Sequence, residues 1–160
     1  MEKEWNFKYE VLEIEDLSEQ EKKLFESAKL ARERAYAPYS DFWVGCSVLL
    51  ENGEIYTGNN QENAAYPSGL CAERTALYWL GANFPHEIVK KILIVGGPKD
   101  NSKTDIIVPP CGSCRQSILE YETKQNQNIE IYFANLKGRI FKTRSIRDLL
   151  PFSFDFTFLM

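Results

Sequence analysis

The chain has 160 residues, of which 44% are hydrophobic and 26% charged, with a formal net charge of −4 and an isoelectric point near 5.2. This length fits one domain with its own core, so we expect a single domain over residues 1–160. The net negative charge disfavours nucleic acid as a partner, because its phosphates need a basic surface; a small-molecule substrate fits better.

Neither a membrane segment nor a secretion signal is expected. No uninterrupted apolar run reaches membrane-spanning length, and the first residues, MEKE, lack the apolar core of a signal peptide. The sequence therefore predicts a cytoplasmic protein without membrane partners, in which cysteines serve metal or catalytic roles more often than disulfides.

The hydrophobic pattern predicts alternating helices and strands. In chain order we expect a helix at 18–37, strands at 42–50 and 55–57, a helix at 71–81, a strand at 91–95, a helix at 110–121, strands at 129–133 and 138–143, and a short helix at 145–150. Ser18 and Glu21 form a capping box for the first helix, and Pro38 ends it. This alternation indicates a layered α/β fold, with a mixed β-sheet of about five strands flanked by helices. Residues 1–16 are expected as an N-terminal arm or short strand, and 151–160 as a C-terminal tail.

Three of the four cysteines lie in two short motifs, CAER at 71–74 and PCGSCRQ at 110–116. Cys71, Cys111 and Cys114 offer three thiolates, and a catalytic zinc ion takes three protein ligands and keeps a fourth position for water. Each motif begins a predicted helix, where the helix dipole and unpaired backbone N–H groups favour thiolates. The pattern predicts a catalytic site with one Zn²⁺ per subunit.

Two other interpretations of these cysteines are a structural zinc site and a redox Cys-x-x-Cys pair. A structural site needs a fourth protein ligand, but the only histidine, His86, lies in a predicted surface loop. The fourth cysteine, Cys46, lies in a predicted strand, where a small core residue is the simplest interpretation. A redox pair would leave Cys71 unused, so we favour the catalytic site.

Glu73 stands two residues after a zinc ligand. A glutamate near a helix start commonly compensates the helix dipole, yet this position also makes Glu73 a candidate general base. Zinc with three thiolates carries one net negative charge, which weakens its hold on hydroxide. Arg74 and Arg115 lie close to the ligands and are expected to withdraw charge by donating hydrogen bonds to sulfur.

The two cysteine motifs resemble those of the zinc-dependent cytidine deaminases, in the small homotetrameric type with three cysteine ligands. PYSDFWVG (38–45), GNNQENAAY (58–66) and LLP (149–151) match that family in the same order, and the resemblance covers roughly residues 17–154. It implies a three-layer cytidine-deaminase-like fold and hydrolysis of cytidine and deoxycytidine to uridine and deoxyuridine, with release of ammonia, in pyrimidine salvage. Glu73 then moves protons between water, the ring nitrogen and the leaving amine.

The resemblance also implies the residues that bind the nucleoside. Phe42 becomes a pocket wall, although most strand aromatics belong to the core. Asn60 and Glu62 point the same way in an extended stretch and can hold ribose hydroxyls, although either could be an ordinary polar loop residue. The backbone of Ala64 contacts the base. Gln61 replaces a usual aliphatic residue, and we expect it to change packing only.

The tail holds four phenylalanines at alternate positions, 152, 154, 156 and 158, which an extended chain would place on one side. Simple packing on the parent sheet is an alternative, above all for the last two. In the resembling family the aromatic residue that matches Phe154 closes over the base in an adjacent active site. We therefore expect a homotetramer with shared active sites, in which Phe152 is a second candidate for this role.

Two further functions stay open from the sequence. One is a related zinc deaminase that acts on an aminonucleoside antibiotic or another base, against which Asn60 and Glu62 favour a ribose-bearing substrate. The other is a non-catalytic zinc-stabilised binding protein, which would keep the metal and show no turnover.

Overall fold

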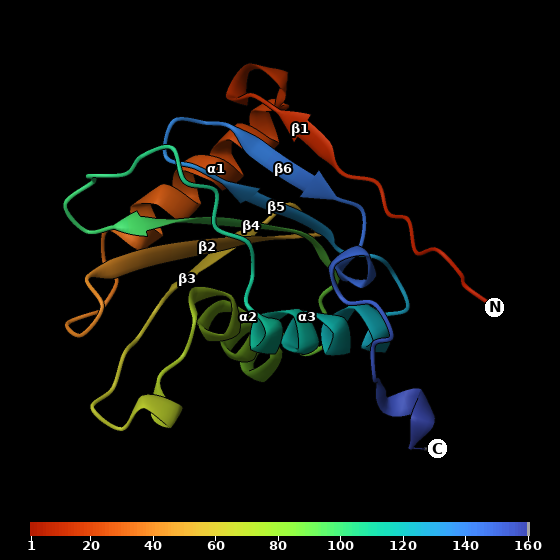
Figure 1. Ribbon diagram of the computed structural model, residues 1–160. Coiled ribbons are helices and arrows are strands. Elements are labelled where there is room, and N and C mark those ends of the chain that lie inside the picture. The colour runs from red at the N-terminus through yellow and green to blue at the C-terminus, as the bar shows by residue number, and fades with distance from the viewer. Residues whose placement is uncertain (160) are drawn as a thin grey trace.

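A six-stranded β-sheet in the order β1-β6-β5-β4-β2-β3 forms the centre of the computed structural model, which describes residues 1–159 (Figure 1). The strands are β1 (Glu10–Leu12), β2 (Phe42–Leu50), β3 (Ile55–Asn59), β4 (Val89–Pro98), β5 (Glu130–Ala134) and β6 (Ile140–Thr143). β4 and β5 run parallel and the other neighbours run antiparallel. The predicted mixed sheet is confirmed, and its sixth strand, β1, comes from the N-terminal arm.

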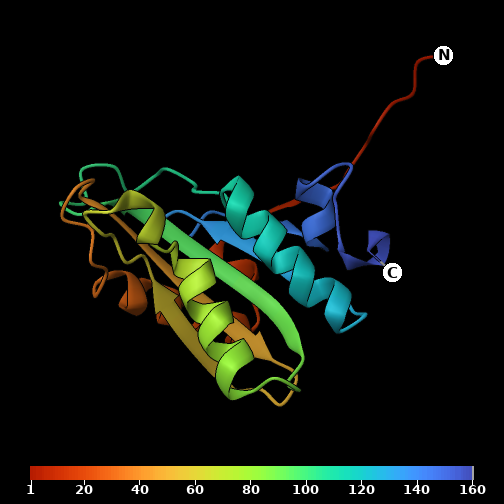
Figure 2. The same cartoon turned by 90° about the horizontal axis from the view of Figure 1, so that it is seen from below.

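Helices cover both faces of this sheet, which gives three layers (Figures 1 and 2). They are α1 (Glu19–Arg32), α2 (Ala72–Asn83) and α3 (Gly112–Lys124). On one face Leu24 and Phe25 of α1 pack in a core with Leu93 of β4. On the other, Leu77 of α2 and Ile118 of α3 share the larger core. None of the helices within residues 1–159 is both long enough and apolar enough to span a membrane.

α1 ends at Arg32, well before Pro38, so its predicted C-terminal part is wrong. The cause is a pairing between the segment after α1 and the segment after β3. The backbone N–H of Tyr36 donates to the carbonyl of Asn60 at 3.0 Å, and the N–H of Glu62 donates to the carbonyl of Tyr36 at 2.8 Å. An extended residue at 36 cannot belong to a helix, and its pairing places residues 38–40 beside the loop after β3.

The predicted helix at 145–150 is a short 3-10 helix, η3 (Ile146–Leu149). The buried carboxylate of Glu122 on α3 explains its position, because it accepts hydrogen bonds from the backbone N–H of Ile146 at 3.1 Å and of Ile129 at 2.9 Å. The other 3-10 helices are η1 (Ile14–Asp16), η2 (Tyr66–Ser68) and η4 (Phe156–Phe158).

The C-terminal tail is not extended, so the prediction of four rings on one side is wrong. Asp155 accepts a hydrogen bond from the backbone N–H of Thr157 at 3.0 Å and thereby caps η4. This helical turn brings residues four apart together, and the rings of Phe154 and Phe158 stack with centroids 5.4 Å apart.

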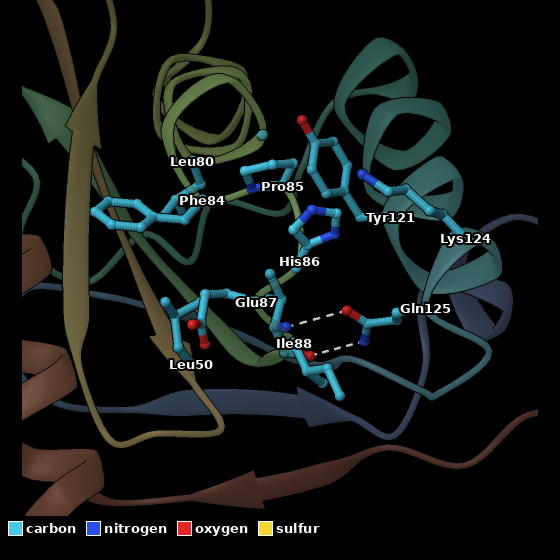
Figure 3. A pocket seen from close by; sticks show the side chains of 12 residues that line it. Leu50, Leu80, Phe84, Pro85, His86, Glu87, Ile88, Tyr121, Lys124 and Gln125 are labelled. Carbon is cyan, nitrogen blue, oxygen red and sulfur yellow. Dashed lines mark hydrogen bonds between the residues drawn. The ribbon is translucent and has the colours of Figure 1, made fainter.

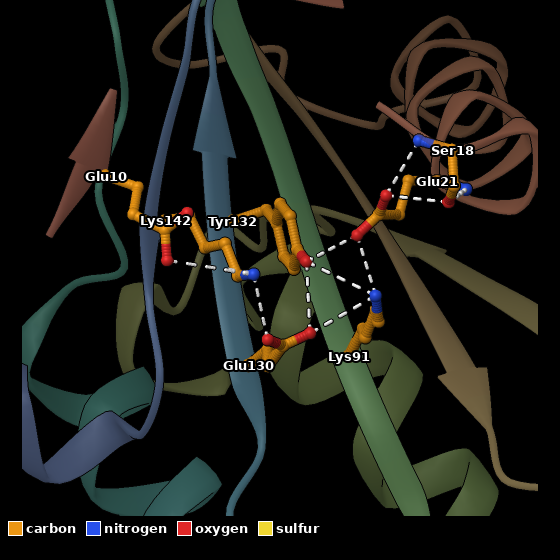
Figure 4. A network of polar contacts seen from close by, with 7 residues as sticks. All are labelled: Glu10, Ser18, Glu21, Lys91, Glu130, Tyr132 and Lys142. Atoms are coloured by element: carbon orange, nitrogen blue, oxygen red, sulfur yellow. Dashed lines mark hydrogen bonds and ion pairs between the residues drawn. The ribbon is translucent and has the colours of Figure 1, made fainter. Parts of the chain in front are cut away.

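A network of charged side chains joins α1 to the sheet (Figure 4). Glu21 Oε1 lies 2.7 Å from Lys91 Nζ and accepts a hydrogen bond of 2.7 Å from the Tyr132 hydroxyl. Glu130 pairs with Lys91 at 3.2 Å and with Lys142 at 2.9 Å. Burial raises the pKa of Glu21, but the hydrogen bonds, led by that from Lys91, outweigh it and lower the pKa to about 2.

We predict that Glu21→Gln lowers the free energy of unfolding at pH 7 by about 1–3 kcal/mol, because it removes charge-assisted hydrogen bonds. The folded pKa of about 2 lies below the ordinary 4.5, so the unfolded chain takes up the proton first. The wild type therefore loses this contribution as the pH falls from about 4.5 towards 2. Urea unfolding at several pH values measures the difference. Glu19→Gln is the control, since Glu19 is 87% exposed; equal losses in both variants would contradict the prediction.

Candidate metal centre and substrate cleft

Three cysteines meet where α2 and α3 begin. Cys71 and Cys111 are the N-cap residues of these helices, and Cys114 lies in the first turn of α3. The Cys71 and Cys111 sulfur atoms are 3.8 Å apart, those of Cys111 and Cys114 are 3.5 Å apart, and all three lie within 4.8 Å of one another. The two helix starts predicted from the cysteine motifs are confirmed.

The start of α2 packs very closely on β3. A Cβ atom at Gly58 would lie 2.6 Å from both the carbonyl oxygen of Ala72 and the backbone nitrogen of Ala76. Only glycine permits this approach without displacing backbone atoms. The contact fixes the end of β3 next to Cys71, and the loop that follows β3 therefore begins beside the cysteine cluster.

The spacing and chemistry of the cluster fit zinc. With Zn–S bonds of about 2.3 Å, tetrahedral geometry places two sulfur ligands about 3.8 Å apart. Among residues 1–159 this is the one group of three or more Cys, His, Asp or Glu side chains close enough to share an ion, and it has three members. A tetrahedral ion held there would keep one position for a non-protein ligand.

His86 does not approach this centre. It lies in a separate pocket of about 250 Å³ lined by the C-terminal ends of α2 and α3, close to Tyr121 and Gln125 (Figure 3). Cys46 is fully buried in β2, as predicted for a core residue. Neither residue belongs to the cysteine group, so the structure offers no fourth protein ligand from the predicted alternatives.

Arg74 supplies positive charge to the cluster. Its Nη2 donates to the Cys71 sulfur at 3.6 Å, and its Nε is buried without a hydrogen-bond partner among residues 1–159. A hydrogen bond with Cys114, and then bonds from Arg74 and Cys111, outweigh burial and lower the pKa of Cys71 to about 5. The first proton therefore leaves the cluster readily, and the Cys71 thiolate in turn raises the pKa of Cys114.

Within residues 1–159 the side chain of Arg115 donates to backbone carbonyls and not to sulfur, which corrects the prediction. Its Nε donates to the carbonyl of Pro110 at 2.8 Å, and its Nη1 donates to the carbonyl of Leu149 at 2.8 Å. A guanidinium on α3 reaches these two carbonyls because the segment before Cys111 and η3 both lie against the start of that helix. Arg115 consequently ties the metal-site loop to the segment that leads into the tail.

Glu73 lies in the first turn of α2 with only 3% of its surface exposed. Burial raises its pKa to about 7, against the opposing effect of its own backbone N–H. It is not a member of the cysteine group. A buried carboxyl that titrates near neutral pH can both accept and donate a proton there.

A cleft of about 430 Å³ lies beside the cluster, and its lining includes Asn60, Glu62 and Cys71. The Asn60 amide is already oriented: its oxygen accepts from the backbone N–H of Val44 at 2.8 Å and its nitrogen donates to the carbonyl of Phe42 at 2.8 Å. One amide hydrogen remains for a ligand.

Glu62 is held by the loop at 38–40. Its carboxylate accepts hydrogen bonds from the backbone N–H of Tyr39, at 2.8 Å, and of Ser40, and from the Ser40 hydroxyl. The Ser40 hydroxyl is the main cause of its lowered pKa. Glu62 is therefore ionised at neutral pH and presents a fixed acceptor to the cleft.

Other predicted binding residues are placed differently. Phe42 is half-buried and Ala64 exposed, and neither is among the residues that line the cleft in the described part of the chain. Phe154 lies on the tail, and α3 separates the tail from α2 in both views (Figures 1 and 2). The sequence assigned no role to Tyr39 and Tyr66, whose rings lie 5.7 Å apart in the cleft; their positions in two matching motifs were the available signal.

Fold and centre together define a three-layer α/β protein with a cluster of three cysteines whose spacing fits zinc. Residues 18–128 match the family model for the cytidine and deoxycytidylate deaminase zinc-binding region. A cytidine deaminase from Sporosarcina psychrophila is 41% identical over 133 residues, which are 83% of this chain and 90% of the relative. One from Halalkalibacterium halodurans is 38% identical over 131 residues, with 82% and 91% covered.

Solved structures agree with these relatives. The crystal structure of a cytidine deaminase from Burkholderia pseudomallei has a TM-score of 0.71 and 38% identity, covering 83% of this chain and 98% of that one. That from Mycobacterium tuberculosis has a TM-score of 0.63 and 31% identity, covering 83% and 95%. The chain belongs to the cytidine and deoxycytidylate deaminase zinc-binding family.

Proposed function

We propose that the chain is a cytidine deaminase, which hydrolyses cytidine and deoxycytidine to uridine and deoxyuridine and releases ammonia, as in pyrimidine salvage. The observation that carries this proposal is a buried carboxyl, Glu73, in the first turn of α2, two residues after a member of the three-cysteine cluster. The relatives named cytidine deaminase, matched over about nine-tenths of their length, support it. Cytoplasmic location and the lack of nucleic-acid or membrane partners remain predictions from composition.

Cys71, Cys111 and Cys114 would hold the zinc ion. When bound, zinc lowers the pKa of a water ligand towards about 7 and so supplies a nucleophile at neutral pH. Arg74 offsets part of the thiolate charge through its bond to the Cys71 sulfur.

Glu73 would move the protons of the reaction. Its carboxylate accepts a proton from the attacking water, and the resulting carboxylic acid donates that proton to the ring nitrogen next to C4. A second proton passes through the same carboxyl to the departing amine, so ammonia leaves and not its anion.

Asn60 and Glu62 would hold the ribose. The carboxylate of Glu62 can accept from a sugar hydroxyl, and the remaining N–H of Asn60 can donate to one. Both side chains are fixed by backbone hydrogen bonds before any ligand arrives, which reduces the ordering cost of binding. Phe42 and the backbone of Ala64, which do not line the cleft among the residues that the structure describes, stay predicted contacts of the base from the family resemblance alone.

We predict that Glu73→Gln keeps one zinc per chain and binds cytidine, while turnover falls at least ~10²-fold, because an amide cannot shuttle protons. Zinc analysis and ammonia release measure both properties. Cys71→Ala is the comparison variant, expected to lose zinc and thermal stability together with activity. Turnover by Glu73→Gln within about tenfold of wild type would remove Glu73 from the mechanism.

We predict that Glu62→Gln raises KM for cytidine about tenfold or more, because the hydrogen bond to the ribose loses its charged acceptor. Turnover of free cytosine, which has no ribose, should not change. Glu120→Gln, at an exposed position on α3, serves as the matched control. Equal effects on cytidine and cytosine would mean that the loop only shapes the cleft.

The alternative activities are separated by one assay. Zinc-loaded protein is incubated with cytidine, deoxycytidine, cytosine, cytidine monophosphate and blasticidin S, and ammonia release is followed. Release from blasticidin S or cytosine alone would replace the proposed substrate, and no release from any of them would favour a zinc-stabilised binding protein.

We also propose a homotetramer in which the tail of one subunit completes the cleft of another. Three features support this arrangement: Phe154 is 56% exposed, it does not line the cleft of its own chain within residues 1–159, and α3 lies between the tail and α2. Phe152 is 95% exposed, with its ring centroid 6.0 Å from that of Trp5 in the N-terminal arm, and stays the second candidate for this role.

Mixing two impaired parents at a cytidine concentration below KM tests the shared site. Phe154→Ala and Glu73→Gln protomers are exchanged, and we predict activity above the sum of the separate parents, because some clefts regain both groups. Wild type mixed with Glu73→Gln controls for exchange. Activity no greater than the parental sum, or a monomer by light scattering, would contradict the proposal.

A further inference from the structure

Phe154 and Phe158 form a stacked aromatic pair in the tail, which is attached to α3 and remains partly exposed. The rings of Phe154 and Phe158 stack at an interplanar angle of 14°, and 56% of Phe154 remains exposed. Gln116 on α3 donates from Nε2 to the carbonyl of Phe154 at 2.8 Å. Phe154 is thereby attached to the helix that carries two of the zinc ligands.

Arg147 of η3 holds the same turn through its guanidinium fork. Nη2 donates to Asp155 Oδ2 at 2.8 Å and to Thr123 Oγ1 at 3.2 Å, and Nη1 donates to Ser153 Oγ at 3.1 Å. Asp155 is only 6% exposed and also caps η4 through Thr157. The residues immediately before and after Phe154 are thus bound by one guanidinium.

The backbone just before this turn is strained. Phe152 has a φ of +53°, in the left-handed region that favours glycine and is costly for a bulky side chain. Such a conformation persists only where surrounding contacts determine it. The bonds from Arg147 to Ser153 and Asp155, directly after Phe152, are contacts of this kind.

We propose that Arg147 and Asp155 are positioning residues that preset the Phe154 ring for the nucleoside in a neighbouring subunit's cleft. The inference rests on the proposed role of Phe154 and identifies the hydrogen bonds of Arg147 and Asp155 as the contacts that hold its ring in place. An exposed tail would otherwise have to order its backbone and ring on each binding event, which weakens binding. Presetting the turn removes that cost without touching the proton transfers of Glu73.

The experiment measures KM and kcat for cytidine in Arg147→Met and Asp155→Asn, each alone and combined with Phe154→Ala. Asp155→Asn keeps a side chain that can cap η4 but removes the charge that pairs with Arg147. It therefore tests the Arg147–Asp155 ion pair without deleting the cap. Arg139→Met is the matched control, since Arg139 pairs with Glu13 at 3.0 Å on the surface near β6. Zinc content and hydrogen exchange of the amides at 157 and 158 are followed in every variant.

Stacking is worth roughly 0.5–1.5 kcal/mol, so Phe154→Ala should raise KM about two- to tenfold. Arg147→Met and Asp155→Asn should raise KM by up to the same factor, with kcat within about twofold, zinc unchanged and faster exchange in the tail. In the Phe154→Ala background, Arg147→Met and Asp155→Asn should have no further effect on KM, because the Arg147–Asp155 pair acts through the Phe154 ring.

Different results would contradict the inference about Arg147 and Asp155 and the proposed role of Phe154. If Phe154→Ala raises KM while Arg147→Met and Asp155→Asn keep the wild-type KM, the inference about Arg147 and Asp155 is wrong and the proposed role of Phe154 stands. The inference is also wrong if Arg147→Met raises KM by the same factor in the Phe154→Ala background, because the guanidinium then affects KM independently of the Phe154 ring. Unchanged KM in Phe154→Ala itself overturns the proposed role of the ring, and the inference with it, while leaving the role of Glu73 standing.

Discussion

Three sulfur atoms within 4.8 Å of one another are a constraint that the rest of the molecule must satisfy. Ionised thiols repel each other, so the cluster needs positive charge from helix starts, from Arg74 and from a metal ion. The two helix starts meet because α2 and α3 pack in the same core on one face of the sheet. β4 makes this possible, because it connects the two helices and pairs parallel with β5, which follows α3.

The substrate cleft is joined to the cluster through backbone hydrogen bonds. Gln61 bridges to Tyr36 on one side and to Leu70 on the other, with two bonds of 2.9 Å to Leu70. Leu70 directly precedes Cys71, so the loop that presents Asn60 and Glu62 is tied by main-chain hydrogen bonds to the residue next to the cysteine cluster. The Gln61 side chain donates from Nε2 to Asn59 Oδ1 and lines the cleft, so the polar residue at 61 has a hydrogen-bond partner in the same loop.

Local signals in the sequence were sufficient for the helix starts and for most strands. The capping box at Ser18 depends on residues within one turn, and the starts of α2 and α3 were predicted from the apolar run after Cys71 and from Pro110. The end of α1, the carbonyl partners of Arg115 and the turn in the tail depend on residues far away in the chain. Tyr36 meets Asn60, and Arg147 meets Asp155, only after folding, and no periodicity records such meetings.

β1 has a consequence for how the folded molecule meets its neighbours in concentrated solution. The outer backbone of β6 would otherwise invite edge-to-edge association with another chain, and the antiparallel pairing with β1 occupies it. The new outer strand is only three residues long and carries the charge of Glu10, which leaves little template for sheet growth. The first seventeen residues precede the span that matches the deaminase family, yet they supply the strand that pairs with β6 and covers this edge of the sheet.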